Sequence, residues 1–269
     1  MITTPALPAV IEAPPVSAPA SVASRLLSIL DVFAHPDARA SLSLSEIAQN
    51  TGLPVSTVHR MLAELVEWGG LARRDDGRYT LGLRLWELGT RVPATRSLRA
   101  IALPFLEDLY EATHQHVHLA VLDGSEALYI EKLSAHRAVP VVSSVGARLP
   151  LHSTGVGLVL LAHAPAEDLD EYVARELPRF LPRTVTSPQA LRRRLAEIRL
   201  SGVAHSSEEM TAGTSSVAAP IRDRASRVVA ALSVVTGSEP RQGDLLEREV
   251  RAAAAGVSRA LGYRRSVVA

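Results

Sequence analysis

The chain has 269 residues, 47% of them hydrophobic, a formal net charge of +1 and no cysteine. This apolar content suffices for one large domain or two smaller ones and excludes a disordered chain. Without cysteine, disulfides, zinc–thiolate sites and thiol nucleophiles are excluded. Residues 1–20, rich in Pro, Ala and Val, are predicted to form a disordered arm. Neither a secretory signal pattern nor an apolar run long enough to span a membrane is present, so we expect a cytoplasmic protein without membrane contact.

The first predicted helix begins at Ser21, whose hydroxyl can cap it, and ends near His35-Pro36. Its apolar stripe consists of Val22, Leu26, Ile29, Leu30 and Phe33. Residues 42–44 are predicted to form a short strand.

Residues 44–68 predict two short helices joined by a tight turn, which is a helix-turn-helix. Ser45 is expected to cap the first helix, and Gly52 supplies the positive φ that ends it. The second helix starts at Leu53-Pro54. Its apolar residues recur at i, i+3, i+4 and i+7, which makes one buried face of Val58, Met61, Leu62 and Leu65.

The opposite face of the second helix is polar and includes Ser56, Thr57, His59, Arg60 and Glu64. Small polar groups at the helix start, with an arginine behind them, suit a helix that enters the major groove of DNA. The alternative is an ordinary helical hairpin whose polar face only meets water, because short motifs give many false positives.

A two-stranded hairpin with an Asp-Gly turn is predicted over residues 71–81, directly after these helices. A hairpin in this position is a wing, and its arginines Arg73, Arg74 and Arg78 could contact phosphate or a minor groove. Residues 1–95 contain eight arginines and nine acidic residues, a net charge of −1, so DNA affinity must come from local placement of arginines. A protein-binding role for this winged domain is a further alternative.

The predicted domains are therefore an arm at 1–20, a winged helix-turn-helix domain at 21–82, a linker helix at 83–95 and a second domain at 96–269. In the linker helix, Leu85, Leu88 and Val92 share one side, close to Trp86. This apolar side could pack within one chain or against a second subunit, and the pattern leaves both possibilities open.

The second domain is predicted to be α+β, with helices packed on a mostly antiparallel sheet of five or six strands. Strands are expected at 116–122, 127–133, 139–144, 203–206, 215–221 and 228–236, with a loop at 146–150. Helices are expected from Thr95 through Leu109, with Pro104 as a kink or break, and at 153–164, 166–175, 188–200 and 244–261. This is a common architecture for small-molecule sensing.

His114, His116 and His118 alternate and on a strand would share one face, so two of these imidazoles with a third ligand such as His152 could hold a divalent metal. Against this, the spacing lacks carboxylate or cysteine partners, so loop and strand histidines without metal are the preferred interpretation. A serine hydrolase would rest on composition alone, because no Gly-x-Ser-x-Gly turn occurs.

Segments of both predicted domains resemble a known protein family. LPVSTVHRMLAEL followed by GGLARRDDGRYTLG is similar to the winged domain of the IclR family of bacterial transcription regulators. Three later segments resemble the effector-binding domain of that family: LAVLDGSEALYIEKL, GARLPLHSTGVGLVLLA and SSVAAPIRDRASRVVAALSVVTG. The resemblance runs from about residue 21 to the end of the chain.

The resemblance implies a DNA-binding side formed by Ser56, Thr57 and Arg60, with Val55 where many relatives carry a basic residue. It also implies an effector pocket over the sheet face, where a helix start suits a carboxylate. The chain departs from the usual pattern at two places, with Gly157-Leu158 where many relatives read GK and Ser206 where several have an aspartate before the late strands. The implied effector-binding residues are Leu149, Gly155, Val156, Ser206, Ser216, Ser233 and Val235.

Together these features predict a ligand-responsive transcription regulator, and repressors occur in this family. Its expected partners are a palindromic double-stranded DNA operator, a small organic effector that is a carboxylate or an aromatic compound, and further copies of itself in a homodimer or homotetramer. No cofactor, metal or catalytic residue is expected. The alternative is a metal-dependent or serine-type enzyme with an accessory winged domain.

Overall fold

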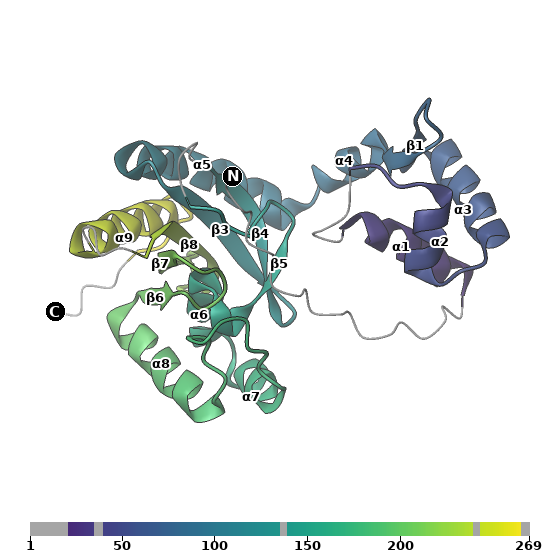
Figure 1. Cartoon of the computed structure of the whole chain (residues 1–269). Helices are drawn as coiled ribbons and strands as arrows, with labels where there is room; N and C mark the ends of the chain where they lie inside the picture. The colour runs from purple at the N-terminus through teal and green to yellow at the C-terminus, as the bar shows by residue number, and fades with distance from the viewer. Residues whose placement is uncertain (1–20, 35–39, 135–138, 239–242, 265–269) are drawn as a thin grey trace, which may run out of the picture. The chain divides into compact units, whose positions relative to one another are not determined.

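The computed structural model describes residues 21–34, 40–134, 139–238 and 243–264. Its contacts divide the chain into two compact units, Met1–Pro93 and Ala94–Ala269, which Figure 1 draws in purple to blue and in teal to yellow. The predicted arm at 1–20 lies outside the described residues. No described helix is long and apolar enough to cross a membrane.

The first unit is built on three helices, α1 (Val22–Ala34), α2 (Leu44–Thr51) and α3 (Val55–Trp68). The Ser21 hydroxyl accepts a hydrogen bond from the Ser24 amide at 3.0 Å, as a cap for α1. The predicted apolar faces meet in one core that includes Ile29, Ile47, Met61 and Leu62. Val22, the first residue of the predicted stripe in α1, is exposed instead.

Ser43 caps α2, so the expectation that Ser45 does so is wrong. The Ser43 hydroxyl accepts from the Glu46 amide, while the Glu46 carboxylate accepts from the Ser43 amide at 2.7 Å. This reciprocal pair needs an acidic residue three positions after the cap, and Glu46 stands at that distance only from Ser43. Gly52 ends α2 with φ 67°, as predicted.

The predicted wing is present as β1 (Leu71–Arg73) and β2 (Tyr79–Leu81), with Gly77 at φ 78° in the connecting loop. The strand expected at 42–44 is a single bridge, in which Leu42 pairs with Tyr79. The helix expected over 83–95 ends earlier, because α4 spans Leu83–Gly89 and α5 begins at Pro93. Proline disfavours helical backbone in the residue before it but suits the first turn of a new helix.

The second unit is a six-stranded antiparallel sheet with the order β5-β4-β3-β8-β7-β6. The strands are β3 (His116–Asp123), β4 (Glu126–Leu133), β5 (Arg148–Pro150), β6 (Ala204–Ser207), β7 (Thr214–Arg222) and β8 (Val228–Gly237). The central strands β3 and β8 pair although they lie far apart in the sequence. The predicted α+β class with an antiparallel sheet is confirmed.

Helices cover both faces of this sheet, as Figure 1 shows. On one face, α5 (Pro93–Thr113, with Pro104 inside the helix) and α9 (Gly243–Ala260) share a core with the sheet. On the other face lie α6 (Gly155–Ala162), α7 (Ala166–Ala174) and α8 (Pro188–Ser201). Every residue of α6 is buried, so this short helix is the centre of the second core.

The third strand, expected at 139–144, is absent, and residues 139–144 form an irregular segment. The strand beside β4 is β5, in the part predicted to be a loop, and it pairs Leu149 with Ala127. Pro140 has no amide hydrogen to donate to a neighbouring strand. Val141 and Val142 are apolar because they face a pocket, so the pattern that predicted a strand has another cause.

Candidate nucleic-acid interface and ligand pocket

The polar face of α3 is turned away from the core of the first unit. Ser56, His59 and Arg60 are exposed and Thr57 is half-buried. The opposite face, with Val58 and its apolar neighbours, is buried. Among the described residues, Arg60 has no hydrogen-bond or ion-pair partner. Its guanidinium is therefore available for a ligand outside the chain.

The three wing arginines have different surroundings. Arg73 lies 6.0 Å from the centre of the Tyr79 ring, and Arg74 pairs with Asp76 at 3.3 Å; both arginines are exposed. Arg78 turns inward: its Nη2 donates to the Ser41 carbonyl at 2.9 Å and to the Glu46 carboxylate at 2.7 Å. Arg78, which the sequence predicted as a DNA contact, thus links the wing to the start of α2 through hydrogen bonds.

The same network lowers the pKa of Glu46. Hydrogen bonds from the Ser43 amide and hydroxyl are the largest cause, and the Arg78 guanidinium adds to them. The capping carboxylate is therefore held in its charged form, which suits the positive end of α2.

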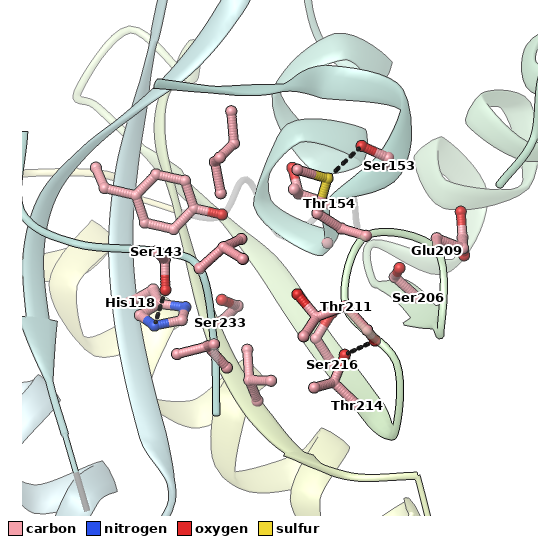
Figure 2. A pocket seen from close by; sticks show the side chains of 17 residues that line it. His118, Ser143, Ser153, Thr154, Ser206, Glu209, Thr211, Thr214, Ser216 and Ser233 are labelled. Carbon is pink, nitrogen blue, oxygen red and sulfur yellow. Dashed lines mark hydrogen bonds between the residues drawn. The ribbon is translucent and has the colours of Figure 1, made fainter. Parts of the chain in front are cut away.

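In the second unit a pocket opens between the sheet and the start of α6 (Figure 2). Counting the space open to solvent, its volume is about 460 Å³. The segments 141–143 and 209–211 supply further walls. The lining residues are His118, Tyr129, Val141, Val142, Ser143, Leu149, Ser153, Thr154, Gly155, Ser206, Glu209, Met210, Thr211, Thr214, Ser216, Ser233 and Val235.

Strand register explains which sheet residues face the pocket. His118 pairs with Ser233, and Val235 pairs with Ser216, so these side chains project from one face of three neighbouring strands. The next pocket-side positions along β7 and β8 are alanines, which let α6 approach closely. A Cβ at Gly155 would lie 2.6 Å from the Ser216 hydroxyl oxygen, so this approach requires glycine.

The start of α6 presents polar groups to the pocket. The Thr154 hydroxyl accepts from the Gly157 amide at 3.2 Å and donates to the Pro150 carbonyl at 3.0 Å. The first amides of a helix have no acceptor within the helix, and the helix dipole is positive at this end. Together with the hydroxyls of Ser153 and Ser216, they make this part of the pocket suitable for an anionic or hydrogen-bond-accepting group.

Charges near the pocket are already paired. Glu209 accepts two bonds of 2.7 Å from Arg194 on α8, and both side chains are largely buried. Lys132, which does not line the pocket, donates to the Ser143 carbonyl at 2.6 Å. Burial lowers the pKa of His118 to about 3, with Lys132 and His116 adding to the shift. Among the described residues, the pocket wall therefore carries no unpaired positive charge.

Six of the seven effector-binding residues predicted from the sequence lie together in this pocket: Leu149, Gly155, Ser206, Ser216, Ser233 and Val235. Val156 does not line the pocket, because its side chain is 1% exposed and points from α6 into the hydrophobic core. Sequence reasoning missed His118, Tyr129, Ser143 and Glu209. Alternation along β3 indicated only that His118 shares a strand face with His116; its place in the pocket depends on its pairing with Ser233 on β8, for which the sequence carries no local signal.

The histidines considered as metal ligands do not come together in the fold. His114 precedes β3 with φ 51°, while the rings of His116 and His118 stack at 6.2 Å. His152 lies elsewhere, with its ring nitrogens 2.8 Å from the Tyr172 hydroxyl and 3.0 Å from the Pro178 carbonyl. Among the described residues, no three histidine or acidic side chains gather in a way that could hold a metal ion.

A winged helix-turn-helix with an exposed polar helix face, in one chain with an α+β unit that holds a polar-and-apolar pocket, defines the class of ligand-responsive DNA-binding regulators. Family models support this class. The IclR helix-turn-helix domain matches residues 22–75, and the bacterial transcriptional regulator IclR C-terminal domain matches residues 91–259. The chain belongs to the IclR family of bacterial transcription regulators.

Individual relatives agree over most of their length. The HTH-type transcriptional regulator XynR of Escherichia coli is 36% identical over 244 residues, which cover 89% of this chain and 96% of XynR. The transcriptional repressor IclR of the same bacterium is 32% identical and covers 84% and 83% of the two chains. These relatives are transcription regulators, so the chain is a regulator and not an enzyme.

Solved structures show the same architecture. An IclR homolog from Microbacterium hydrocarbonoxydans, complexed with 4-hydroxybenzoate, matches with a TM-score of 0.85 and 38% identity, covering 90% of this chain and 99% of that one. The IclR protein of Thermotoga maritima matches with a TM-score of 0.72 and 34% identity, covering 90% and 98%.

Proposed function

We propose that this regulator binds a palindromic operator as a homodimer or homotetramer, and that a small organic acid with an aromatic ring changes its affinity for DNA. The observation that carries the proposal is the pocket at the start of α6, in a chain whose Arg60 on α3 is exposed and has no partner within the described part of the chain. The two features give one molecule a DNA-binding face and a place for an effector.

The DNA contacts are assigned to α3 and to the wing. Ser56, Thr57, His59 and Arg60 face the major groove, where arginine pairs well with guanine and small hydroxyls contact several bases. Arg73 and Arg74 contact the phosphate backbone. Arg78 is left out of this set because its guanidinium is bonded to Ser41 and Glu46.

Self-association is supported by exposed apolar side chains on α4. Leu83 is 80% exposed and Trp86 69%, and their i, i+3 spacing places them on the same side of the helix, while Leu88 on another side is 50% exposed; exposed apolar surface of this kind marks an interface. Two copies joined there would present two α3 helices, whose half-sites lie roughly 34 Å apart on DNA. Trp86→Asp should convert the oligomer to monomers in light-scattering measurements, whereas Val145→Asp, at an exposed valine of the second unit, should not.

The effector class follows from the pocket and from the relative that binds 4-hydroxybenzoate. A carboxylate at the start of α6 would accept from the helix amides and from neighbouring hydroxyls. Val141, Val142 and Leu149 give the pocket apolar walls that suit a ring. Effector binding shifts the second units, and α4 carries this shift to the spacing of the two α3 helices.

Two measurements test the proposal with the full chain. Selection from a random duplex library should enrich a palindrome, and mobility-shift assays should show tight binding to it that weakens with salt. The midpoint temperature of thermal denaturation should rise when benzoate or 4-hydroxybenzoate is added but not when acetate is added. The two aromatic acids should also change operator affinity. Failure to enrich any sequence would overturn the DNA-binding proposal. Enrichment without response to either aromatic acid would overturn the effector class alone.

A further inference from the structure

His118 places a buried ring in the pocket with one nitrogen still free. The residue is 2% exposed, and its Nε2 lies 3.0 Å from the Ser143 hydroxyl oxygen. Its Nδ1 has no hydrogen-bond partner among the residues that the structure describes. Figure 2 shows the ring at the pocket wall, with one nitrogen bonded to Ser143 and the other directed toward the Ser233 side. Among the described residues, the fully buried side-chain nitrogen without a partner is His116 Nδ1, so the free nitrogen of His118 is instead accessible from the pocket that His118 lines, where a ligand can form a hydrogen bond with it.

The ring of His118 is uncharged. Burial in the sheet disfavours the imidazolium, and the Lys132 ammonium and His116 ring lower the pKa further, to about 3. A neutral imidazole offers one N–H and one lone pair. After the bond with Ser143, the free nitrogen can exchange one hydrogen bond with a ligand but supplies no positive charge.

The pocket therefore has two different polar ends. The start of α6, with Ser153 and Ser216, combines hydroxyls with the positive end of a helix dipole and suits an anion. His118 and Ser143 lie on another side of the pocket in Figure 2 and offer neutral groups. A carboxylate placed there would lose its hydration without gaining an unpaired counter-charge, because Lys132 does not line the pocket.

We propose that His118 selects the end of the effector that lies away from its acid group, and that it accepts a neutral hydroxyl or amino group and rejects a second carboxylate. The effector class is then a hydroxylated or aminated aromatic monoacid, not a diacid. This inference rests on the proposed function, whose effector class it narrows.

Calorimetric titration of the full chain at pH 7.5 with four probes tests this. They are 4-hydroxybenzoate, benzoate, 4-methylbenzoate and terephthalate, which share a ring and one carboxylate. 4-Hydroxybenzoate should bind about tenfold more tightly than benzoate, a difference of about 1.4 kcal/mol for one hydrogen bond. 4-Methylbenzoate has the size of 4-hydroxybenzoate but leaves the His118 nitrogen unpaired, so it should bind at least tenfold more weakly than 4-hydroxybenzoate. Terephthalate should bind at least 100-fold more weakly than 4-hydroxybenzoate.

Variants assign the effect to this residue. His118→Leu should reduce the preference for 4-hydroxybenzoate over benzoate to about one, while His118→Gln, which keeps a neutral polar group, should retain part of it. The matched control is His205→Asn, because His205 is exposed on β6 and bonds Glu247 at 3.0 Å; its preferences should equal those of the unaltered chain. The ratio of two affinities within one variant is independent of a general loss of folded protein.

Several outcomes would overturn the inference. These are equal binding of 4-hydroxybenzoate and 4-methylbenzoate, tight binding of terephthalate, or an unchanged preference in His118→Leu. The first two are measured on the unaltered chain, so they decide the matter even if His118→Leu does not fold. If none of the four probes binds, the aromatic effector class fails together with this inference, while operator selection tests the DNA-binding proposal independently.

Discussion

The ion pair between Arg194 and Glu209 should hold one wall of the pocket, and Arg194→Met tests this. Arg194 lies on α8 and donates two bonds of 2.7 Å to the Glu209 carboxylate, whose side chain is only 5% exposed. Glu209 belongs to the segment that lines the pocket together with Met210 and Thr211. Methionine keeps the length of the side chain but leaves the buried carboxylate without its partner.

The expected cost is about 3 kcal/mol of unfolding free energy, because removing one member of a buried pair strands a charge in the interior. Urea unfolding of the full chain can separate the two units, since both tryptophans, Trp68 and Trp86, lie in the first unit. The transition seen by far-ultraviolet circular dichroism and not by tryptophan fluorescence belongs to the second unit. With a slope of about 2 kcal/mol per molar urea, its midpoint should fall by roughly 1.5 M.

Arg192→Met is the matched control, on the same helix. Arg192 pairs with Asp170 at 2.6 Å, but both side chains are about half exposed, so the change should cost less than about 1 kcal/mol. Adding Glu209→Gln to Arg194→Met should recover part of the loss, because the buried charge is then absent. A shift below about 0.5 M in Arg194→Met would show that the carboxylate relaxes into water, and the reasoning from its burial would be refuted.

Three further predictions concern both units. Arg60→Ala should weaken operator binding at least tenfold in a mobility-shift assay without moving the tryptophan-monitored urea midpoint, whereas Arg78→Met should lower that midpoint; the reverse pattern would exchange their roles. Gly155→Ala should weaken aromatic-acid binding in calorimetry because its Cβ meets the Ser216 hydroxyl. Adding Ser216→Ala should relieve this clash and restore part of the affinity, while the loss of the Ser216 hydroxyl keeps it below that of the unaltered chain; no change in the single variant would contradict this steric argument. The pKa of Glu46 is lowered in the folded chain, so its stabilising effect is present above the ordinary value of 4.5 and is lost as the pH falls below it. The urea midpoint monitored by tryptophan fluorescence should therefore decrease as the pH is lowered below about 4.5, and it should decrease less steeply in Glu46→Gln. Equal slopes in the two proteins would contradict the assignment of this pH dependence to Glu46.

Much of the fold could be predicted because local chemistry decides it. The spacing of Val58, Met61 and Leu62 selected the buried face of α3, and Gly52 marked its turn. The two strands around Asp123-Gly124 followed from alternation and a turn signal. Two predictions failed for different reasons. The strand at 139–144 was predicted from apolar residues that line a pocket, among them Val141 and Val142. Ser43 caps α2 in place of Ser45 because the Glu46 side chain accepts a hydrogen bond from the Ser43 amide.

The pocket was only partly predictable. Leu149, Gly155, Ser216 and Val235 came from the family resemblance, and the structure gathers them at one site. His118 could not be placed there, because its alignment with Ser233 depends on the pairing of β3 with β8, more than one hundred residues later in the chain. Likewise, no local pattern distinguishes Arg78 from Arg73 or Arg74, yet only Arg78 reaches Glu46.

The sequence by itself determined the helices, most strands, the winged motif and the family, because periodicity, caps and turn residues act over a few positions. The tertiary structure alone decided which polar groups are already satisfied and which remain open to a ligand. Hydrogen bonding and burial depend on partners brought together from distant parts of the chain. For that reason the sequence could name Arg60 as a DNA contact, but only its surroundings show that it has no partner among the described residues, and only they make His118 Nδ1 a candidate ligand contact.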